Sequence, residues 1–172
     1  MSPEDALKYD EFWRKNGIGS NETWDAFKNA NPNGTIDDYF KIVQDQSPWP
    51  LGYIPEEVLL NPGDKFEMAL AVGQDPEFPG RWGTDINTIT DVDYVRNDLA
   101  VKPNWKPDID IVAQYQVKEG ITIPSLVGPV GPQIDLLSNS YYPGGANQVN
   151  LLIDYVENMM DYLDIIGVRP IK

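Results

Sequence analysis

The stretch "DIVAQYQV", residues 110–117, shows most clearly what kind of fold this chain adopts. Apolar and polar residues alternate along it, which is typical of a β-strand with one buried face. Similar short runs lie on either side of it, bounded by Gly, Pro and Asp: "KFEMALAV" at 65–72, "RWGT" at 81–84 and "GITIPSLV" at 120–127. The sequence therefore predicts a β-rich region that begins near residue 60.

Residues 1–46 have a helical pattern instead. Three segments each begin with a Ser, Asn or Thr that can cap a helix and carry apolar residues at helical spacing. They are "SPEDALKYDEFWRKNG" (2–17), "SNETWDAFKNANP" (20–32) and "TIDDYFKIVQDQ" (35–46). We predict three short amphipathic helices that form a small cap, residues 1–50, packed on a second domain, residues 51–172.

The two remaining regions are a connector and the C-terminal end. "SPWPLGYIPEEVLLNPGD" (47–64) is rich in Pro and predicts an extended connection between the domains. "NQVNLLIDYVENMMDYLDIIG" (147–167) carries apolar residues at helical spacing and predicts a helix that ends at Gly167. Gln148 then lies either on a strand end before this helix or in its first turn.

Composition excludes several classes of function. The chain has 172 residues with 13 Lys and Arg against 27 Asp and Glu, so its formal net charge is −14. This charge argues against nucleic acid or an anionic membrane surface as the partner, because both need clustered cations. No run approaches the ~20 apolar residues of a membrane-spanning helix. Because Cys and His are both absent, disulfides, imidazole or thiolate metal sites and histidine-based catalysis are excluded.

Two acidic pairs, Asp91 with Asp93 and Asp108 with Asp110, raise the question of calcium. The segments "DVD" and "DID" lack the Gly and the terminal Glu of an EF-hand loop. We interpret them as solvated turns, and we expect no metal cofactor.

Five short motifs follow one another along the chain, each weak alone. They are "PGDKF" (62–66), "GRWGT" (80–84), "VRNDLAV" (95–101), "YQVKEGITIPSLVGPVGP" (115–132) and "PGGANQV" (143–149). As an ordered set they resemble the motifs of the tuberculosis-necrotizing-toxin-like (TNT-like) NAD glycohydrolase domains of secreted and polymorphic bacterial toxins. The resemblance covers residues 50–167 and departs from the family at Lys65, where an Arg is usual, in the absent histidine, and in a long insert, "QIDLLSNSYY" (133–142).

This resemblance implies an α+β fold with a β-rich ADP-ribosyltransferase-like core, in which two packed sheets hold NAD in a cleft. It implies NAD(P)+ as substrate, with no further cofactor, and hydrolysis to nicotinamide and ADP-ribose. It also implies a toxin C-terminal domain that is delivered into the target-cell cytoplasm and inhibited by a cognate immunity protein. The acidic chain suits a basic inhibitor.

The composition permits this chemistry. Nicotinamide leaves NAD+ as an already cationic group, so its departure needs no proton, and the reaction passes through an oxocarbenium-like ribosyl state. Neither a histidine nor a thiol is required. A Gln amide, with one acceptor and two donors, can hold a ribose hydroxyl and orient water.

The resemblance also implies roles for individual residues. Gln148 is expected at the ribose, and Arg96, with Arg81 and Lys65, at the pyrophosphate. Trp82 and Phe78 are candidate stacking faces. The remaining expected contacts are a hydrogen bond from Thr84 and close backbone approach at Gly144 and Gly145.

Other interpretations of the same residues stay open. Arg81 and Arg96 are equally able to pair with neighbouring acids, namely Asp85, Asp93 and Asp98. Trp82 also suits a core position, and Gln148 also suits an ordinary polar loop. At the level of function, the alternatives are an ADP-ribosyltransferase that modifies a protein and a non-catalytic interaction module such as an immunity or adaptor protein.

Overall fold

The computed structural model describes residues 1–154 and 156–172. Its N-terminal part contains three helices, α1 (Pro3–Asn16), α2 (Asn21–Ala30) and α3 (Ile36–Asp45). Ser2, Ser20 and Thr35 cap them, and each side-chain oxygen accepts a hydrogen bond from a backbone N–H of the first turn. The three helices predicted from the sequence are confirmed.

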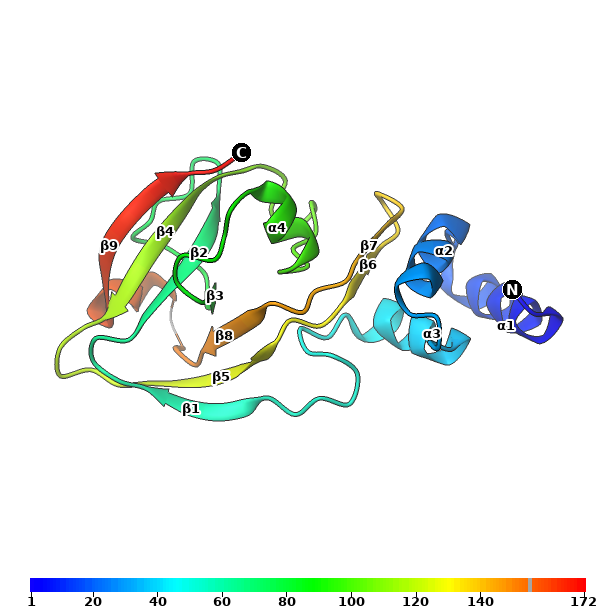
Figure 1. Ribbon diagram of the computed structural model, residues 1–172, viewed down its shortest axis with the longest axis horizontal. Helices are drawn as coiled ribbons and strands as arrows, with labels where there is room; N and C mark the ends of the chain where they lie inside the picture. Colours follow the sequence, from blue (N-terminus) through cyan, green and yellow to red (C-terminus); the bar gives the residue numbers. More distant parts are fainter. Residues whose placement is uncertain (155) are drawn as a thin grey trace.

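The helices pack together through a buried aromatic cluster and rest on a hairpin of the β-rich part. The hairpin consists of β6 (Gln133–Asp135) and β7 (Ser140–Tyr142), which form a two-stranded sheet of their own. Its residues Ile134 and Tyr141 pack against the helical cluster, and Figure 1 shows the hairpin reaching from the sheet to the helices at one end of the molecule. The long insert noted in the sequence is therefore the support on which the helices sit.

The main sheet has seven strands in the order β1-β5-β8-β3-β2-β4-β9, and every neighbouring pair is antiparallel. The strands are β1 (Glu56–Leu60), β2 (Lys65–Ala71), β3 (Trp82–Thr84), β4 (Ile109–Val117), β5 (Ile123–Pro129), β8 (Asn147–Leu151) and β9 (Leu163–Pro170). The short β3 joins β1-β5-β8 to β2-β4-β9 (Figure 1). The expectation of two packed sheets is therefore corrected to one continuous sheet, accompanied by the hairpin.

The largest core cluster lies on one face of this sheet. Phe66, Met68 and Leu70 alternate along β2 and point into a cluster that includes Tyr115 and Leu151. A second cluster forms under the short helix α4 (Val92–Asn97), whose Val95 is fully buried. The strand predictions for 65–72, 81–84, 110–117 and 120–127 are thus confirmed to within a few residues.

One prediction from the sequence was wrong. The C-terminal segment is not one helix: β8 and β9 flank a 3-10 turn, η1 (Val156–Asp161). The helical spacing of its apolar residues was overridden by strand pairing, because β8 inserts between β5 and β3 while β9 pairs with β4. The Pro-rich segment 47–64, predicted as an extended connection, contains the edge strand β1, a position where nearby prolines are tolerated.

In the part of the chain that the structure describes, no helix has both the length and the apolar character needed to cross a membrane.

Candidate functional site

A cavity of about 450 Å³ opens where β2, β3 and β8 meet α4 and the segment after it. Thr84 of β3 and Gln148 of β8 stand directly opposite each other in the sheet and both line this cavity. Opposed residues of an antiparallel pair project from the same face. The sheet thus brings together two side chains that are 64 positions apart in the sequence, each from a different motif of the ordered set.

Gln148 is held in one orientation. Its side chain is 7% exposed, and its Nε2 donates a hydrogen bond to the Pro48 carbonyl oxygen at 2.6 Å. Its Oε1 makes no hydrogen bond with any residue that the structure describes. Because the amide nitrogen of Gln148 is bonded to Pro48, the atom that the side chain offers to the cavity is its oxygen, a hydrogen-bond acceptor. Sequence reasoning left open whether Gln148 is on a strand or in a helix; it lies on strand β8.

Thr84 and Trp82 complete this wall. The Thr84 hydroxyl donates to the Asn147 carbonyl oxygen at 2.6 Å, which ties β3 to the start of β8. Trp82 also lines the cavity and is 41% exposed, with its ring 5.8 Å from that of Trp49. Three of the residues predicted from the sequence as substrate contacts, Gln148, Trp82 and Thr84, therefore gather at one cavity.

The segment that follows α3 forms part of the cavity wall, which the sequence did not indicate. Gln133 Nε2 donates to the Ser47 carbonyl oxygen at 2.8 Å, and the Gly131 N–H donates to that of Pro48 at 2.8 Å. Together with the Gln148 bond, these contacts fix residues 47–48 across the edge of the cavity. The N-terminal helices are thus joined to the site through a segment that orients Gln148.

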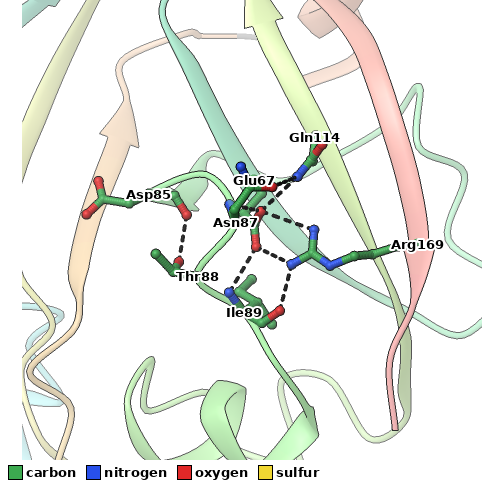
Figure 2. Close-up of polar contacts among 7 residues, drawn as sticks. All are labelled: Glu67, Asp85, Asn87, Thr88, Ile89, Gln114 and Arg169. Atoms are coloured by element: carbon green, nitrogen blue, oxygen red, sulfur yellow. Dashed lines mark hydrogen bonds and ion pairs between the residues drawn. The ribbon is translucent and has the colours of Figure 1, made fainter.

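A buried carboxylate, Glu67 of β2, also lines the cavity. Figure 2 shows its polar contacts. Arg169 of β9 approaches both of its oxygens, at 3.1 Å to Oε1 and 2.6 Å to Oε2. The backbone N–H groups of Asn87 and Ile89 donate to it at 2.5 and 3.0 Å, and Gln114 Nε2 at 3.2 Å. Every acceptor direction of the carboxylate therefore points at a donor.

The charge state of Glu67 follows from these contacts. Burial acts to raise its pKa, but the hydrogen bonds from Arg169 and from the Ile89 and Asn87 N–H groups outweigh burial and hold the pKa below its usual value. An ionised carboxylate with all its acceptors engaged is a poor general base. Glu67 instead holds the loop that follows Thr84, because that loop carries Asn87 and Ile89.

The two predicted arginines are engaged elsewhere and do not line the cavity. Arg96 Nη1 donates to the Val101 carbonyl oxygen at 3.1 Å. Its Nη2 donates to the backbone carbonyl oxygens of Lys106 at 2.7 Å and Pro107 at 3.0 Å. Arg81 Nη2 donates to the Asp154 carbonyl oxygen at 2.5 Å. Neither forms an ion pair with the neighbouring acids among the described residues. Both guanidinium groups bind backbone carbonyl oxygens, and their contact with a pyrophosphate stays a prediction.

The other predicted contacts also lie outside this cavity. Phe78 is exposed in the loop before β3, and Lys65 is exposed at the start of β2. Gly144 and Gly145 have φ of 68° and 102°, which favours glycine. A Cβ on Gly144 would lie 2.5 Å from the Val130 carbonyl oxygen, so this glycine allows the protein's own backbone to approach closely.

Sequence reasoning missed four polar residues of the cavity wall, Gln46, Glu67, Lys106 and Gln133. For Glu67 a signal existed, since it is a carboxylate within the otherwise apolar run "FEMALA". Lys106 and Gln133 had none, because they enter the cavity from segments whose path depends on tertiary contacts. The described residues include no group of three or more acidic side chains placed to hold a metal ion.

No protein-family model and no curated protein sequence matches this chain. Among solved structures, it is similar to that of Tne2 in complex with Tni2, with 22% sequence identity and a TM-score of 0.55. The match covers 72% of this chain and 99% of the other. Two weaker neighbours are Tse6 in complex with Tsi6 and Rhs1-CT in complex with its cognate immunity protein RhsI1.

For Tse6, the identity is 15%, the TM-score is 0.43, and the match covers 87% of this chain and 98% of the other. For Rhs1-CT, the identity is 17%, the TM-score is 0.39, and the match covers 68% of this chain and 80% of the other. At these TM-scores the two weaker neighbours add no argument. The chain shares its fold with Tne2.

Proposed function

We propose that the chain is a toxin domain that hydrolyses the N-glycosidic bond of NAD(P)+ to nicotinamide and ADP-ribose, on a fold of the ADP-ribosyltransferase-like type. The observation that carries this proposal is the meeting of Thr84 and Gln148, register partners on β3 and β8, at one cavity. Each comes from a different motif of the set that resembles the TNT-like domains. A cavity of about 450 Å³ falls within the usual range for small-molecule and cofactor sites.

Gln148 acts through its free oxygen. With Nε2 committed to Pro48, its Oε1 accepts a hydrogen bond from a ribose hydroxyl of the substrate. That contact orients the ribose. It also polarises the O–H bond, so the hydroxyl oxygen becomes more electron-rich and stabilises the positive charge of the ribose as the oxocarbenium-like state forms. The leaving nicotinamide becomes neutral when the bond breaks, and a water molecule attacks the ribosyl carbon and loses its proton to solvent. The mechanism requires no histidine, which agrees with the composition.

Trp82 and the apolar side chains of the cavity supply an environment of low dielectric and a stacking face for the substrate. An apolar enclosure lowers the local dielectric, which strengthens the interaction between the developing positive charge and the Gln148 oxygen. The half-exposed ring of Trp82 offers a stacking face at the cavity edge for nicotinamide or adenine. In the same proposal, a producer of the toxin keeps a basic immunity protein that covers the cavity, and the toxin acts in the target-cell cytoplasm.

A product assay tests this function against its two alternatives. Purified protein is incubated with NAD+ alone, and nicotinamide and ADP-ribose are followed by chromatography. Release of both in equal amounts supports hydrolysis. Nicotinamide release that requires an added protein, with ADP-ribose attached to that protein, would show a transferase. Intact NAD+ in both cases would contradict the enzyme proposal and favour a binding module.

A further inference from the structure

Two lysines near the cavity, one buried and one half-buried, form no ion pair with an acid that the structure describes, although acids outnumber cations 27 to 13 in this chain. Lys102 is 5% exposed and Lys106 is half-buried. Neither belongs to any of the ion pairs formed among residues 1–154 and 156–172. Each instead donates from Nζ to one neutral oxygen, Lys102 to Gln46 Oε1 at 3.1 Å and Lys106 to the Ala69 carbonyl at 2.7 Å.

A buried ammonium group without a counter-charge is costly, so its presence needs a reason. Burial lowers the pKa of both lysines, and for Lys102 the charge of Asp135 acts in the opposite direction. Lys106 has no such opposing acid. A protein that retains a desolvated cation at a cavity wall gains from it when an anion enters the cavity.

The segment that carries these lysines, residues 101–107, is held rigidly. Arg96 donates to three of its carbonyl oxygens, those of Val101, Lys106 and Pro107. Within the segment, the Trp105 and Lys106 N–H groups donate to the Lys102 carbonyl at 3.0 and 3.2 Å. The Lys102 ammonium lies 5.1 Å from the centre of the Trp105 ring. The position of Lys106 is therefore set before any ligand binds.

We propose that Lys106 is the anion-binding residue of the cavity and contacts the diphosphate of a dinucleotide substrate, with Trp105 as the adjoining apolar face. Both side chains line the cavity that Thr84 and Gln148 also line. An ammonium group has three donors, and Ala69 occupies one of them. Arg96 is then a positioning residue that acts through the backbone of the segment. The identity of the ligand rests on the proposed function, whereas the presence of an anion site does not.

Residues 102–106 lie outside all the motifs that carry the family resemblance. The resemblance therefore gives no support to an anion site at Lys106, and its support comes from the contacts and burial of this segment. It also gives Arg96 a role that agrees with its contacts, because a guanidinium bonded to three carbonyls supports the anion site without touching the anion.

Calorimetric titration tests the proposal with three ligands: ADP-ribose and inorganic pyrophosphate, which carry the anion, and nicotinamide riboside, which lacks it. The variant is Lys106→Met, and the matched control is Lys41→Met, at an exposed lysine of α3. We expect Lys106→Met to weaken ADP-ribose and pyrophosphate binding about tenfold or more and to leave nicotinamide riboside unchanged. The control should leave all three unchanged. The melting temperature of Lys106→Met should equal or exceed that of the wild type, because a desolvated charge is removed.

The outcomes separate this proposal from the proposed function. If the wild type binds neither anionic ligand, or if Lys106→Met binds both as tightly as the wild type, the anion site is refuted even when NAD+ is hydrolysed. If binding depends on Lys106 and NAD+ stays intact, the anion site stands and the hydrolase proposal fails. Lys106→Arg, which keeps the charge, should recover part of the affinity and so exclude a purely structural effect.

Discussion

Glu67 and Lys106 line the same cavity and are both charged, but their surroundings differ completely. Glu67 is fully buried and accepts hydrogen bonds from four residues, including bonds from both terminal nitrogens of the Arg169 guanidinium group. Lys106 has no acid beside it within the described residues and reaches a single carbonyl oxygen. A buried charge whose partners are all supplied by the protein stabilises the folded structure. A charge that keeps free donors at a cavity is available to bind a ligand.

The largest effect that this comparison predicts is on stability. Glu67→Gln should lower the free energy of unfolding by about 3 kcal/mol, because Arg169 and two backbone N–H groups lose a charged acceptor in a buried site. Urea unfolding measures the change. The matched control is Glu11→Gln on α1, whose exposed pair with Lys15 should make no measurable difference. Equal unfolding midpoints for the two variants would contradict the structural role of Glu67.

The same ion pair predicts a pH dependence. The pKa of Glu67 is lower in the folded protein than in the unfolded chain. Its stabilisation is therefore complete above the unfolded value of about 4.3 and is lost as the pH falls through the lowered folded value. The difference in unfolding free energy between wild type and Glu67→Gln should shrink as the pH falls below about 4. A difference that stays constant down to acid pH would show that Glu67 is not ionised in the fold.

The orientation of Gln148 predicts an effect on activity. Gln148 Nε2 now lies 2.6 Å from the Pro48 carbonyl oxygen. Gln148→Glu places a carboxylate oxygen at that position, where two acceptors repel each other. NAD+ turnover should fall about a hundredfold at neutral pH, a loss typical of a misplaced transition-state contact. Because burial and the carbonyl raise the pKa of the introduced group, its protonated form can donate to Pro48, and turnover should recover partly as the pH is lowered.

This substitution also bears on the alternative function. If Gln148→Glu were fully active at neutral pH, the contact with Pro48 would not set the orientation of the side chain. If the variant instead gained the ability to modify an added protein, the site would be adaptable to ADP-ribosyl transfer.

The smallest expected effects compare two adjacent glycines. Gly144→Ala should cost about 2 kcal/mol in unfolding free energy, because its Cβ would lie 2.5 Å from the Val130 carbonyl oxygen. Gly145→Ala meets nothing within 4 Å and bears only the strain of its φ of 102°, about 1 kcal/mol. Thermal unfolding of the two variants should rank them in this order. If Gly144→Ala lost more free energy of nucleotide binding than free energy of unfolding, this glycine would be a ligand contact.

The sequence predicted the local parts of the structure best. Caps and helical spacing located α1 to α3, because these signals act within a few residues of the backbone they stabilise. The C-terminal prediction failed because the apolar positions of residues 147–167 fit a helix and a pair of strands equally well. The choice between them was made by the neighbours of β8, namely β5 and β3, which no local pattern reveals.

The candidate site was predicted in part for the same reason. The motif resemblance located Gln148, Trp82 and Thr84, which lie on strands that the sheet holds in register. It also pointed to Arg96, but the side chain turned to the backbone of residues 101–107. Whether an arginine faces a ligand or a carbonyl depends on the path of the chain around it. Lys106 and the Pro48 carbonyl enter the site through such tertiary contacts and could not be predicted from their residue types.

Gln148, oriented by Pro48, is proposed to contribute to NAD+ cleavage in this cavity. The most direct measurement is the turnover of NAD+ by the wild type, by Gln148→Ala and by Gln44→Ala, an exposed glutamine of α3 that serves as the control. We expect Gln148→Ala to lose about a hundredfold or more in kcat while remaining folded, and Gln44→Ala to match the wild type. Equal turnover by all three proteins would contradict this proposal.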